Sequence, residues 1–455
     1  MTAIRRTLTT LPLVFVMYFN ISGGPFTTEG LVASVGPGLA LLILVLVPIF
    51  WSLPETLIVG ELASMLPEEG GYYRWVGRAF GPFWAFQNAW WTWLYSLVDM
   101  AIYPLLFVEY LAYFIPALGA GSGGAAATAP LLRWAIALAV IWGATALNLR
   151  GARPVGRFAV AAGTLVLLPF LLLALAAAPH ISHTPWTPFA RGGVGGGSAL
   201  GSVGVGLSIA LWNYIGWDNA STVGGEIVDA PRTYPRALAL TLPLVSLGYL
   251  IPLSAALGAS DWTLWREGGW PAIALLAGGT AGRPLAAWIG AAGMVSAVSL
   301  FSALLLVSSR IPLVVAEDGL LPRPIAATDA RGTPRNAILV AAALYSLFTL
   351  LPFRKLVVAD VLLYSLALFL EFGALLRIRR AEPLLRGAFR IPVGWAGVCA
   401  LALLPVLILA IVVGLELRDG EFGLPTLVST GVAASLGPPL YFLARRGREA
   451  VNGGR

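Results

Sequence analysis

The sequence predicts an all-α integral membrane protein with twelve transmembrane helices arranged around an inverted repeat. Three observations support this prediction: the composition, the number of membrane-length apolar segments, and helix-breaking residues in two of those segments. The chain has 455 residues, 58% hydrophobic and 11% charged, with one cysteine, whereas an ordinary soluble domain has about 25% charged residues. This composition excludes a water-soluble domain, a disordered chain and a disulfide-rich module, because a soluble fold needs more polar surface.

Twelve apolar segments are long enough to cross a bilayer as helices, which takes about 20 residues each. They are continuous and lack the ten-residue alternation of barrel strands. The first segment follows a short basic N-terminus without a small-residue cleavage pattern, so we expect no cleavable signal peptide. In chain order the segments are 10–37, 39–65, 82–115, 130–149, 156–178, 199–228, 235–258, 284–315, 336–352, 356–376, 393–416 and 423–443.

The basic residues predict the orientation, because cytoplasmic loops are rich in Arg and Lys. With the N-terminus inside, 22 of the 29 basic residues fall on the cytoplasmic side and the other seven on the opposite side. The net charge of +7 is therefore explained by topology, and we expect no nucleic-acid partner. An even number of spans places both termini in the cytoplasm, with the protein embedded in the lipid bilayer of the cytoplasmic (plasma) membrane.

Two segments are interrupted at mid-membrane depth, the first near 22–25 and the sixth near 216–219. The first reads Ser22-Gly23-Gly24-Pro25 and the second Gly216-Trp217-Asp218-Asn219. Gly and Pro cost about 1 and 3 kcal/mol relative to Ala inside a helix, and unwound backbone at this depth is tolerated where it lines a cavity. The interruptions are five spans apart, which is typical of an inverted repeat with a ligand site between two broken helices; the alternative is glycine-mediated helix packing.

The repeat predicts three regions along the chain. We expect the first repeat over 1–190, the second over 191–380, and two further helices with a cytoplasmic C-terminus over 381–455. No loop is long enough to form a soluble domain.

Several motifs resemble those of the amino acid–polyamine–organocation (APC) superfamily. They include 22–26 with Glu29 in the first span, the loop 67–75, and the end of the sixth span, 225–237. The stretches 99–104 and 217–222 are similar to plant-type polyamine-uptake and L-type amino acid permeases. The resemblance implies a LeuT-like 5+5 fold with two extra helices, and transport driven by protons or by exchange; sodium is the other candidate ion.

Acidic residues within the spans are the main functional candidates, because an ionised group at the bilayer centre costs at least about 2.5–3.5 kcal/mol. We expect no Lys or Arg deep enough in a span to pair with them, so protons or a visiting cation must neutralise them. Asp218 is expected to contact the substrate amine or to take the coupling proton, with helix capping as the alternative. Asp99 and Glu29 are candidates for further amine contacts, with interhelical hydrogen bonds as the alternative. Three converging acids favour a polycation over a zwitterion.

The other acids receive different assignments. Glu226 is, with Asp218, a coupling or gating candidate, although a packing contact explains it equally well. Glu109 and Asp360 lie near the ends of their spans, where solvent can reach them. Three acids are expected to have structural or gating roles: Glu55, Glu61 and Glu371.

Aromatic residues and backbone amides complete the predicted site. Trp212 and Trp217 flank the sixth-span interruption, and aromatic faces attract ammonium groups by about 0.5–2 kcal/mol each. Backbone N–H groups of the first interruption would hold any carboxylate. The predicted substrate-binding residues are Ile21, Ser22, Gly23, Gly24, Glu29, Asp99, Tyr103, Trp212, Trp217, Asp218 and Asn219.

These observations predict a permease that moves an amine-containing solute, polyamine or amino acid, by proton-coupled alternating access. The first alternative is a neutral or cationic amino acid permease or exchanger of the same fold. A membrane-embedded enzyme is the least favoured alternative, because the spans contain no histidine and one cysteine, Cys399, whereas catalysis needs a reactive constellation. We expect no catalytic residue, no metal site and no cofactor.

Overall fold

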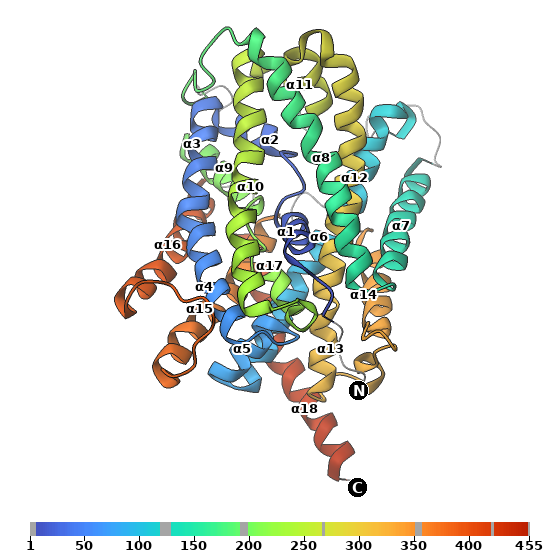
Figure 1. The fold of residues 1–455 in the computed structure, drawn as a ribbon, viewed down its shortest axis with the longest axis vertical. Coiled ribbons are helices and arrows are strands. Elements are labelled where there is room, and N and C mark those ends of the chain that lie inside the picture. Colours follow the sequence, from blue (N-terminus) through green and yellow to red (C-terminus); the bar gives the residue numbers. More distant parts are fainter. Residues whose placement is uncertain are drawn as a thin grey trace.

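The computed structural model describes residues 6–118, 129–191, 199–265, 269–350, 357–419 and 423–453. Its regular structure in these ranges is helical, with two isolated β-bridges (Figure 1). The α-helices are α1 (Thr10–Ile21), α2 (Thr28–Val35), α3 (Pro37–Val47), α4 (Leu53–Met65), α5 (Gly71–Phe80), α6 (Pro82–Phe114), α7 (Ala129–Asn148), α8 (Ala152–Ala177), α9 (Ala199–Trp212), α10 (Ala230–Ala259), α11 (Trp270–Ala277), α12 (Gly282–Ser308), α13 (Arg310–Glu317), α14 (Arg335–Phe348), α15 (Val357–Ala381), α16 (Trp395–Asp419), α17 (Gly423–Ser435) and α18 (Gly437–Gly453). A π-helical turn, η1 (Pro48–Ser52), joins α3 to α4, and the 3₁₀ turns are η2 (Pro116–Leu118), η3 (Ala178–His180), η4 (Asn219–Thr222), η5 (Gly224–Glu226), η6 (Trp262–Leu264), η7 (Gly279–Ala281) and η8 (Arg323–Ala326).

Nine helical runs among the described residues are long and apolar enough to cross a membrane. Each coincides with one of the predicted segments. The three remaining segments contain shorter apolar helices, at Thr10–Ile21, Ser202–Trp212 and Arg335–Phe348. The prediction of an all-helical membrane protein is confirmed, while the total of twelve spans stays a prediction.

The first segment is broken where the sequence predicts it. Between α1 and α2 the chain turns through Gly23 and Gly24, whose φ angles of +143° and +114° favour glycine. A Cβ atom on Gly23 would lie 2.6 Å from Ser296 Oγ and 2.7 Å from Leu300 Cδ1. The glycine therefore lets α12 pack directly against unwound backbone.

The sixth segment is also broken, over a longer stretch than 216–219. α9 ends at Trp212, and the chain up to α10 contains 3₁₀ turns in place of the half-helix that we expected. The close approach of a loop explains this difference, because a Cβ atom on Gly224 would lie 2.7 Å from the carbonyl oxygen of Glu68. A Cβ atom on Gly216, whose φ is +101°, would lie 2.5 Å from the carbonyl oxygen of Asn20. The two broken segments therefore touch each other.

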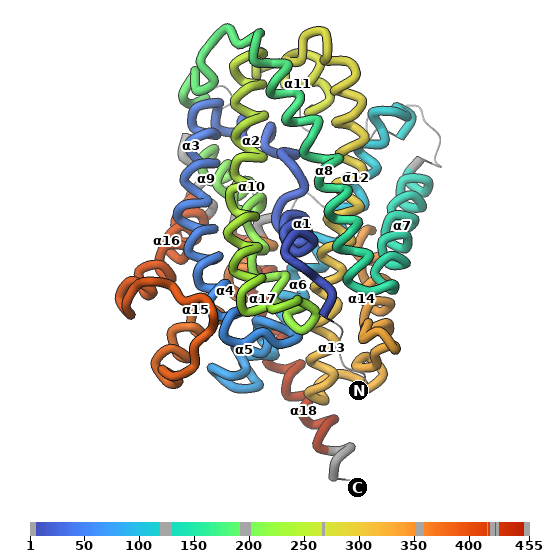
Figure 2. The backbone as a smooth tube through the Cα atoms, in the orientation of Figure 1, coloured from blue at the N-terminus to red at the C-terminus, as the bar shows by residue number. Residues whose placement is uncertain are grey.

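The broken segments lie inside the bundle. α1 packs against α8, α10 and α12, and α12 also packs against α6 and α8. The tube in Figure 2 shows α1 between α10 and α8, with α16 at the periphery. The segment before α1 and the C-terminal helix α18 lie toward the same end of the bundle, near α5 and α13 (Figure 1).

Candidate functional site

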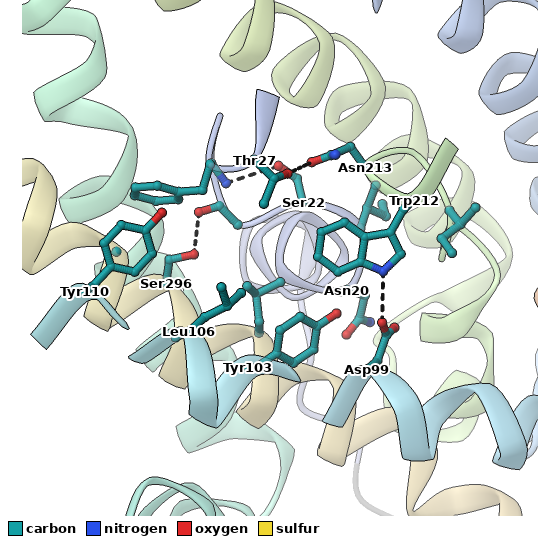
Figure 3. A pocket seen from close by; sticks show the side chains of 18 residues that line it. Asn20, Ser22, Thr27, Asp99, Tyr103, Leu106, Tyr110, Trp212, Asn213 and Ser296 are labelled. Atoms are coloured by element: carbon teal, nitrogen blue, oxygen red, sulfur yellow. Dashed lines mark hydrogen bonds between the residues drawn. The ribbon is translucent and has the colours of Figure 1, made fainter. Parts of the chain in front are cut away.

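A pocket lies where the two broken segments face α6 and α12 (Figure 3). It contains about 550 Å³ of space not filled by atoms, part of it open to solvent. The pocket is lined by Asn20, Ile21, Ser22, Gly23, Gly24, Phe26, Thr27, Asp99, Tyr103, Leu106, Tyr110, Trp212, Asn213, Ile215, Gly293, Ser296, Ala297 and Leu300.

Seven of the predicted binding residues line this pocket and four do not. Those in the lining are Ile21, Ser22, Gly23, Gly24, Asp99, Tyr103 and Trp212. Those outside the lining are Glu29, Trp217, Asp218 and Asn219. The structure therefore does not place the three acids Asp99, Asp218 and Glu29 around one pocket.

Hydrogen bonds hold the first break against its surroundings. Ser296 Oγ on α12 donates to the carbonyl oxygen of Gly23 at 2.5 Å, and the Gly24 N–H donates to Ser22 Oγ at 3.2 Å. Thr27 Oγ1 donates to Asn213 Oδ1 at 3.1 Å, which joins the two broken segments across the pocket (Figure 3). Unwound backbone is stable here because its polar groups find partners inside the protein.

Asp99 is the one charged residue among those that line the pocket. It is 6% exposed, and its Oδ1 accepts a hydrogen bond from Trp212 Nε1 at 3.2 Å. The Tyr103 hydroxyl lies beside the same carboxylate. A buried carboxylate is costly without a cation, and no basic side chain of the lining supplies one. The pocket therefore suits a cationic ligand.

Asn20 is a further polar group in the pocket that the sequence analysis did not single out. Its side chain is 6% exposed, and neither Oδ1 nor Nδ2 has a hydrogen-bond partner in the protein. Nearly all buried polar groups in proteins are satisfied, so an open amide facing a pocket is suited to a ligand. Its position directly before the first break was the available signal.

A second group of acids lies between α4, α15 and the second break. Tyr364 Oη donates to Asp218 Oδ1 at 2.6 Å and is also hydrogen-bonded to Glu55 Oε1. Glu371 is 0% exposed, and neither of its carboxylate oxygens accepts a hydrogen bond in the structure. Next to Asp218, Asn219 Oδ1 accepts a hydrogen bond from Tyr95 Oη at 2.5 Å. We call Glu55, Asp218, Tyr364 and Glu371 the carboxyl cluster.

A hydroxyl group has one proton to donate. Tyr364 can therefore donate to only one of its two carboxyl partners at a time, and the other must donate a proton to the tyrosine oxygen. Among the described residues no ion pair involves Glu55, Asp218 or Glu371. The geometry therefore fits a cluster that contains at least one proton.

The remaining predicted residues are buried in packing contacts. Trp217 is 0% exposed, and its Nε1 donates to the carbonyl oxygen of Tyr214 at 2.7 Å. Glu29, in the first turn of α2, is 2% exposed. Both lie close in sequence to the breaks but outside the pocket lining.

Two acids are paired with buried arginines, which corrects the expectation that no basic residue reaches them. Arg310 is 0% exposed, and its Nη2 and Nε lie 2.5 and 3.0 Å from Glu226 Oε1. Arg379 Nε donates to Glu61 Oε1 at 2.6 Å. Both arginines were assigned to cytoplasmic loops, and their long side chains reach back into the bundle.

The ion pair of Arg310 and Glu226 joins the start of α13 to the last part of the second break and extends to the loop before α5. Glu69 Oε1 lies 3.5 Å from Arg310 Nε, and Glu69 Oε2 accepts a hydrogen bond from the Gly225 N–H at 3.1 Å. Burial, and secondly the neighbouring Glu226, raise the pKa of Glu69 well above its usual range. The Thr7 N–H donates to the carbonyl oxygen of Glu226 at 2.7 Å, so the N-terminal segment is tied to the same network.

The two acids expected within reach of solvent differ from each other. The Glu109 side chain is 49% exposed and forms an ion pair with Arg133. Asp360 is 0% exposed, so the expectation of solvation is wrong there, because α15 packs this first-turn residue against α6. Within the described ranges, no group of three His, Cys, Asp or Glu side chains is arranged to hold a metal ion.

Comparison with known proteins adds to this geometry. A family model described as "Amino acid permease" matches residues 8–430. "Polyamine transporter PUT1" of Oryza sativa subsp. japonica is 35% identical over 443 residues, which cover 97% of this chain and 80% of that protein. "Polyamine transporter RMV1" of Arabidopsis thaliana is 34% identical over 444 residues, covering 97% of this chain and 87% of that protein.

A more distant similarity is to a bacterial antiporter. The "Cadaverine/lysine antiporter" of Escherichia coli is 25% identical over 310 residues, which cover 65% of this chain and 64% of that protein. The resemblance to polyamine-uptake permeases of the APC superfamily, inferred from sequence motifs, is confirmed by the family match and the plant relatives.

Proposed function

This chain belongs to the amino acid permease family, and we propose that it transports polyamines across the cytoplasmic (plasma) membrane by proton-coupled alternating access. Membership of the family supports a transporter of amine solutes in preference to an enzyme. The choice of polyamines, the coupling ion and the transport cycle are the proposal. The names of the plant relatives support the polyamine assignment.

The presence of Asp99 in the pocket is the observation that supports the proposal most strongly. A polyamine brings ammonium groups and no carboxylate, so it supplies the positive charge that this buried acid lacks. Trp212 fixes one carboxylate oxygen through its N–H group, and its indole ring, with Tyr103, adds an aromatic wall that attracts cations. The pocket therefore matches the charge and the apolar chain of an aliphatic amine.

The carboxyl cluster supports proton coupling. The Tyr364 hydroxyl links Asp218 and Glu55, and its single proton requires another proton on one of those two carboxyls. Asp218 belongs to the second break, so a change in its protonation acts directly on the backbone that contacts the pocket. We propose that Asp218 takes the coupling proton.

Alternating access follows from the inverted repeat that we propose over 1–190 and 191–380. In this cycle one group of helices rocks against the other around a fixed central site. The ion pair of Arg310 with Glu226, which also holds the N-terminal segment, would close the cytoplasmic end. This assignment places both termini in the cytoplasm, which fits the position of α18 and of the segment before α1 toward the same end of the bundle (Figure 1).

An amino acid is the second candidate substrate, and one observation favours it. Asn20 has an open side-chain amide beside the first break, and an amide can donate to a carboxylate. In an exchange of an amino acid for a diamine, Asn20 would bind the carboxylate of the amino acid and Asp99 would bind an ammonium group of either substrate. The distant similarity to a cadaverine/lysine antiporter is compatible with such exchange.

Uptake into proteoliposomes tests the proposal. Labelled putrescine and spermidine, and a set of labelled amino acids, are supplied with and without an inward proton gradient. We expect polyamine accumulation that collapses when the gradient is removed. Uptake of amino acids alone would overturn the substrate assignment and leave the family assignment intact.

A single substitution tests the proton assignment separately. Asp218→Asn is expected to abolish accumulation against a gradient in a protein that still folds, since asparagine keeps an acceptor for Tyr364 but takes no proton. Size-exclusion chromatography and thermal unfolding check the fold. Unchanged accumulation and unchanged dependence on external pH would remove Asp218 from the coupling step.

A further inference from the structure

Asp360 is a buried acid that the proposed function does not use. It lies in the first turn of α15 and is 0% exposed, and neither Oδ1 nor Oδ2 has a hydrogen-bond partner in the structure. A buried carboxyl group without a partner costs free energy whether it is ionised or protonated. A group of this kind is most easily explained when a ligand supplies the missing partner.

The surroundings of Asp360 connect it to the pocket. α15 runs antiparallel to α6, since Asn88 Nδ2 donates to the carbonyl oxygen of Ala367 at 3.1 Å and the rings of Tyr95 and Tyr364 pack edge to face with centroids 5.3 Å apart. One turn beyond these tyrosines, the same register brings Asp360 level with Asp99. Asp99 and Tyr103 are four residues apart on α6 and therefore share one face of that helix. Both line the pocket, and α15 packs along α6. Asp360 therefore stands behind the acidic part of the pocket wall.

The two acids lack a basic partner in the described part of the chain. No ion pair there involves Asp99 or Asp360. Two carboxyl groups that share a low-dielectric site repel each other when both are ionised, and a cation between them removes that repulsion. An ammonium group is suited to this role because it has three donors and no acceptor.

We propose that Asp360 is a second carboxylate of the amine site, and that with Asp99 it binds one ammonium group of a diamine or polyamine. The inference rests on the proposed function and deepens it. Trp212 occupies Oδ1 of Asp99, whereas neither oxygen of Asp360 has a hydrogen-bond partner in the structure. Both oxygens are buried behind the pocket lining, so the ammonium group must reach past that lining to bind them. Paired carboxylates also repel the carboxylate of an amino acid, so Asp360 contributes to selection of polyamines over zwitterions.

Asp360→Asn tests the proposal through two readouts on the purified full chain. Thermal unfolding is recorded with and without putrescine, and uptake kinetics of putrescine are measured in proteoliposomes under a fixed proton gradient. We expect the ligand-free variant to unfold at a higher temperature than the wild type, because the asparagine amide can donate to Asp99. We expect the putrescine-induced shift to shrink and KM for putrescine to rise about tenfold or more.

Glu109→Gln is the matched control, since it removes an acid from the helix that carries Asp99 but at an exposed position. Its KM and its putrescine-induced shift should equal those of the wild type. Competition by amino acids provides a further measure, because excess amino acid should inhibit putrescine uptake more strongly in Asp360→Asn than in the wild type.

The outcomes separate the inference from the proposed function. If putrescine is neither transported by the wild type nor stabilises it, the proposed function fails. If the wild type responds and Asp360→Asn keeps its KM and its putrescine-induced shift, only the inference about Asp360 is overturned. A lower unfolding temperature without ligand, or loss of folding in both Asp360→Asn and Asp360→Ser, would give Asp360 a structural role and also overturn it.

Discussion

Replacing Asp99 with asparagine removes a charge from the pocket and preserves its shape. Asparagine keeps a carbonyl oxygen in the place of Oδ1, so the 3.2 Å hydrogen bond from Trp212 Nε1 can persist. The two side chains have the same number of heavy atoms, and no cavity forms. Asp99→Asn therefore measures the contribution of the charge.

The expected magnitude follows from the burial of this group. Asp99 is 6% exposed, so an ammonium group beside it is screened little by solvent. Hydrogen bonds to charged groups contribute about 1.5–3 kcal/mol, and about 1.4 kcal/mol corresponds to tenfold in a binding constant. We expect KM for putrescine to rise at least about tenfold, with a smaller rise for a neutral amino acid.

The assay is the initial rate of uptake of labelled putrescine and a labelled neutral amino acid into proteoliposomes, at a fixed proton gradient. Glu109→Gln serves as the control on the same helix, and Trp212→Phe tests whether the indole N–H is needed to orient the carboxylate. An increase in KM below about threefold for putrescine, or equal losses for the two substrates, would refute the role of the Asp99 charge.

Three further substitutions test the packing around the site. Gly23→Ala should abolish uptake and lower the unfolding temperature, because its Cβ atom would meet Ser296 Oγ at 2.6 Å; wild-type uptake would contradict this. Arg379→Met leaves Glu61 buried without a counter-charge and should cost about 3–5 kcal/mol of stability, most of which Glu61→Gln in the same chain should restore; an unchanged denaturation midpoint would contradict the buried pair. Glu226→Gln should speed amide hydrogen exchange in the N-terminal segment, measured by mass spectrometry. Unchanged exchange would show that this segment is not held by the ion pair of Arg310 with Glu226.

The sequence predicts the spans well because a membrane-length apolar run depends only on the lipid environment of that segment. It does not depend on which other segments pack against it. Each of the nine long runs falls on a predicted segment. The first break was also predictable, since Gly23 and Gly24 before a proline disfavour a helix in any environment. The length of the second break was not, because it depends on the loop backbone at Glu68, which lies 2.7 Å from a Cβ position on Gly224.

The partners of the acids were the least predictable feature. Glu61 and Arg379 are 318 residues apart in sequence, and Glu226 and Arg310 are 84 apart. Both arginines lie at the ends of apolar segments, where composition assigns them to loops. Only the packing of α15 on α4, and of α12 near the second break, brings the charges together. Hydropathy could therefore identify which acids are buried. It could not show which of these acids form an ion pair with an arginine.

The difference between acids that have an arginine partner and acids that have none suggests how substrate and proton are coupled. Glu61 and Glu226 have arginine partners, whereas Asp99 and the carboxyl cluster have none within the described residues. Asp99 and Tyr95 are one turn apart on α6, and Tyr95 bonds to Asn219 beside Asp218, so one helix contacts both unpaired groups. During alternating access the pocket is closed to water on both sides, and a carboxylate without a counter-charge costs free energy in such a state. A carrier can therefore pass through this state only after each acid has gained a cation. In the proposed cycle, an ammonium group at Asp99 and a proton at Asp218 would both be required for reorientation, even though the two positive charges repel each other.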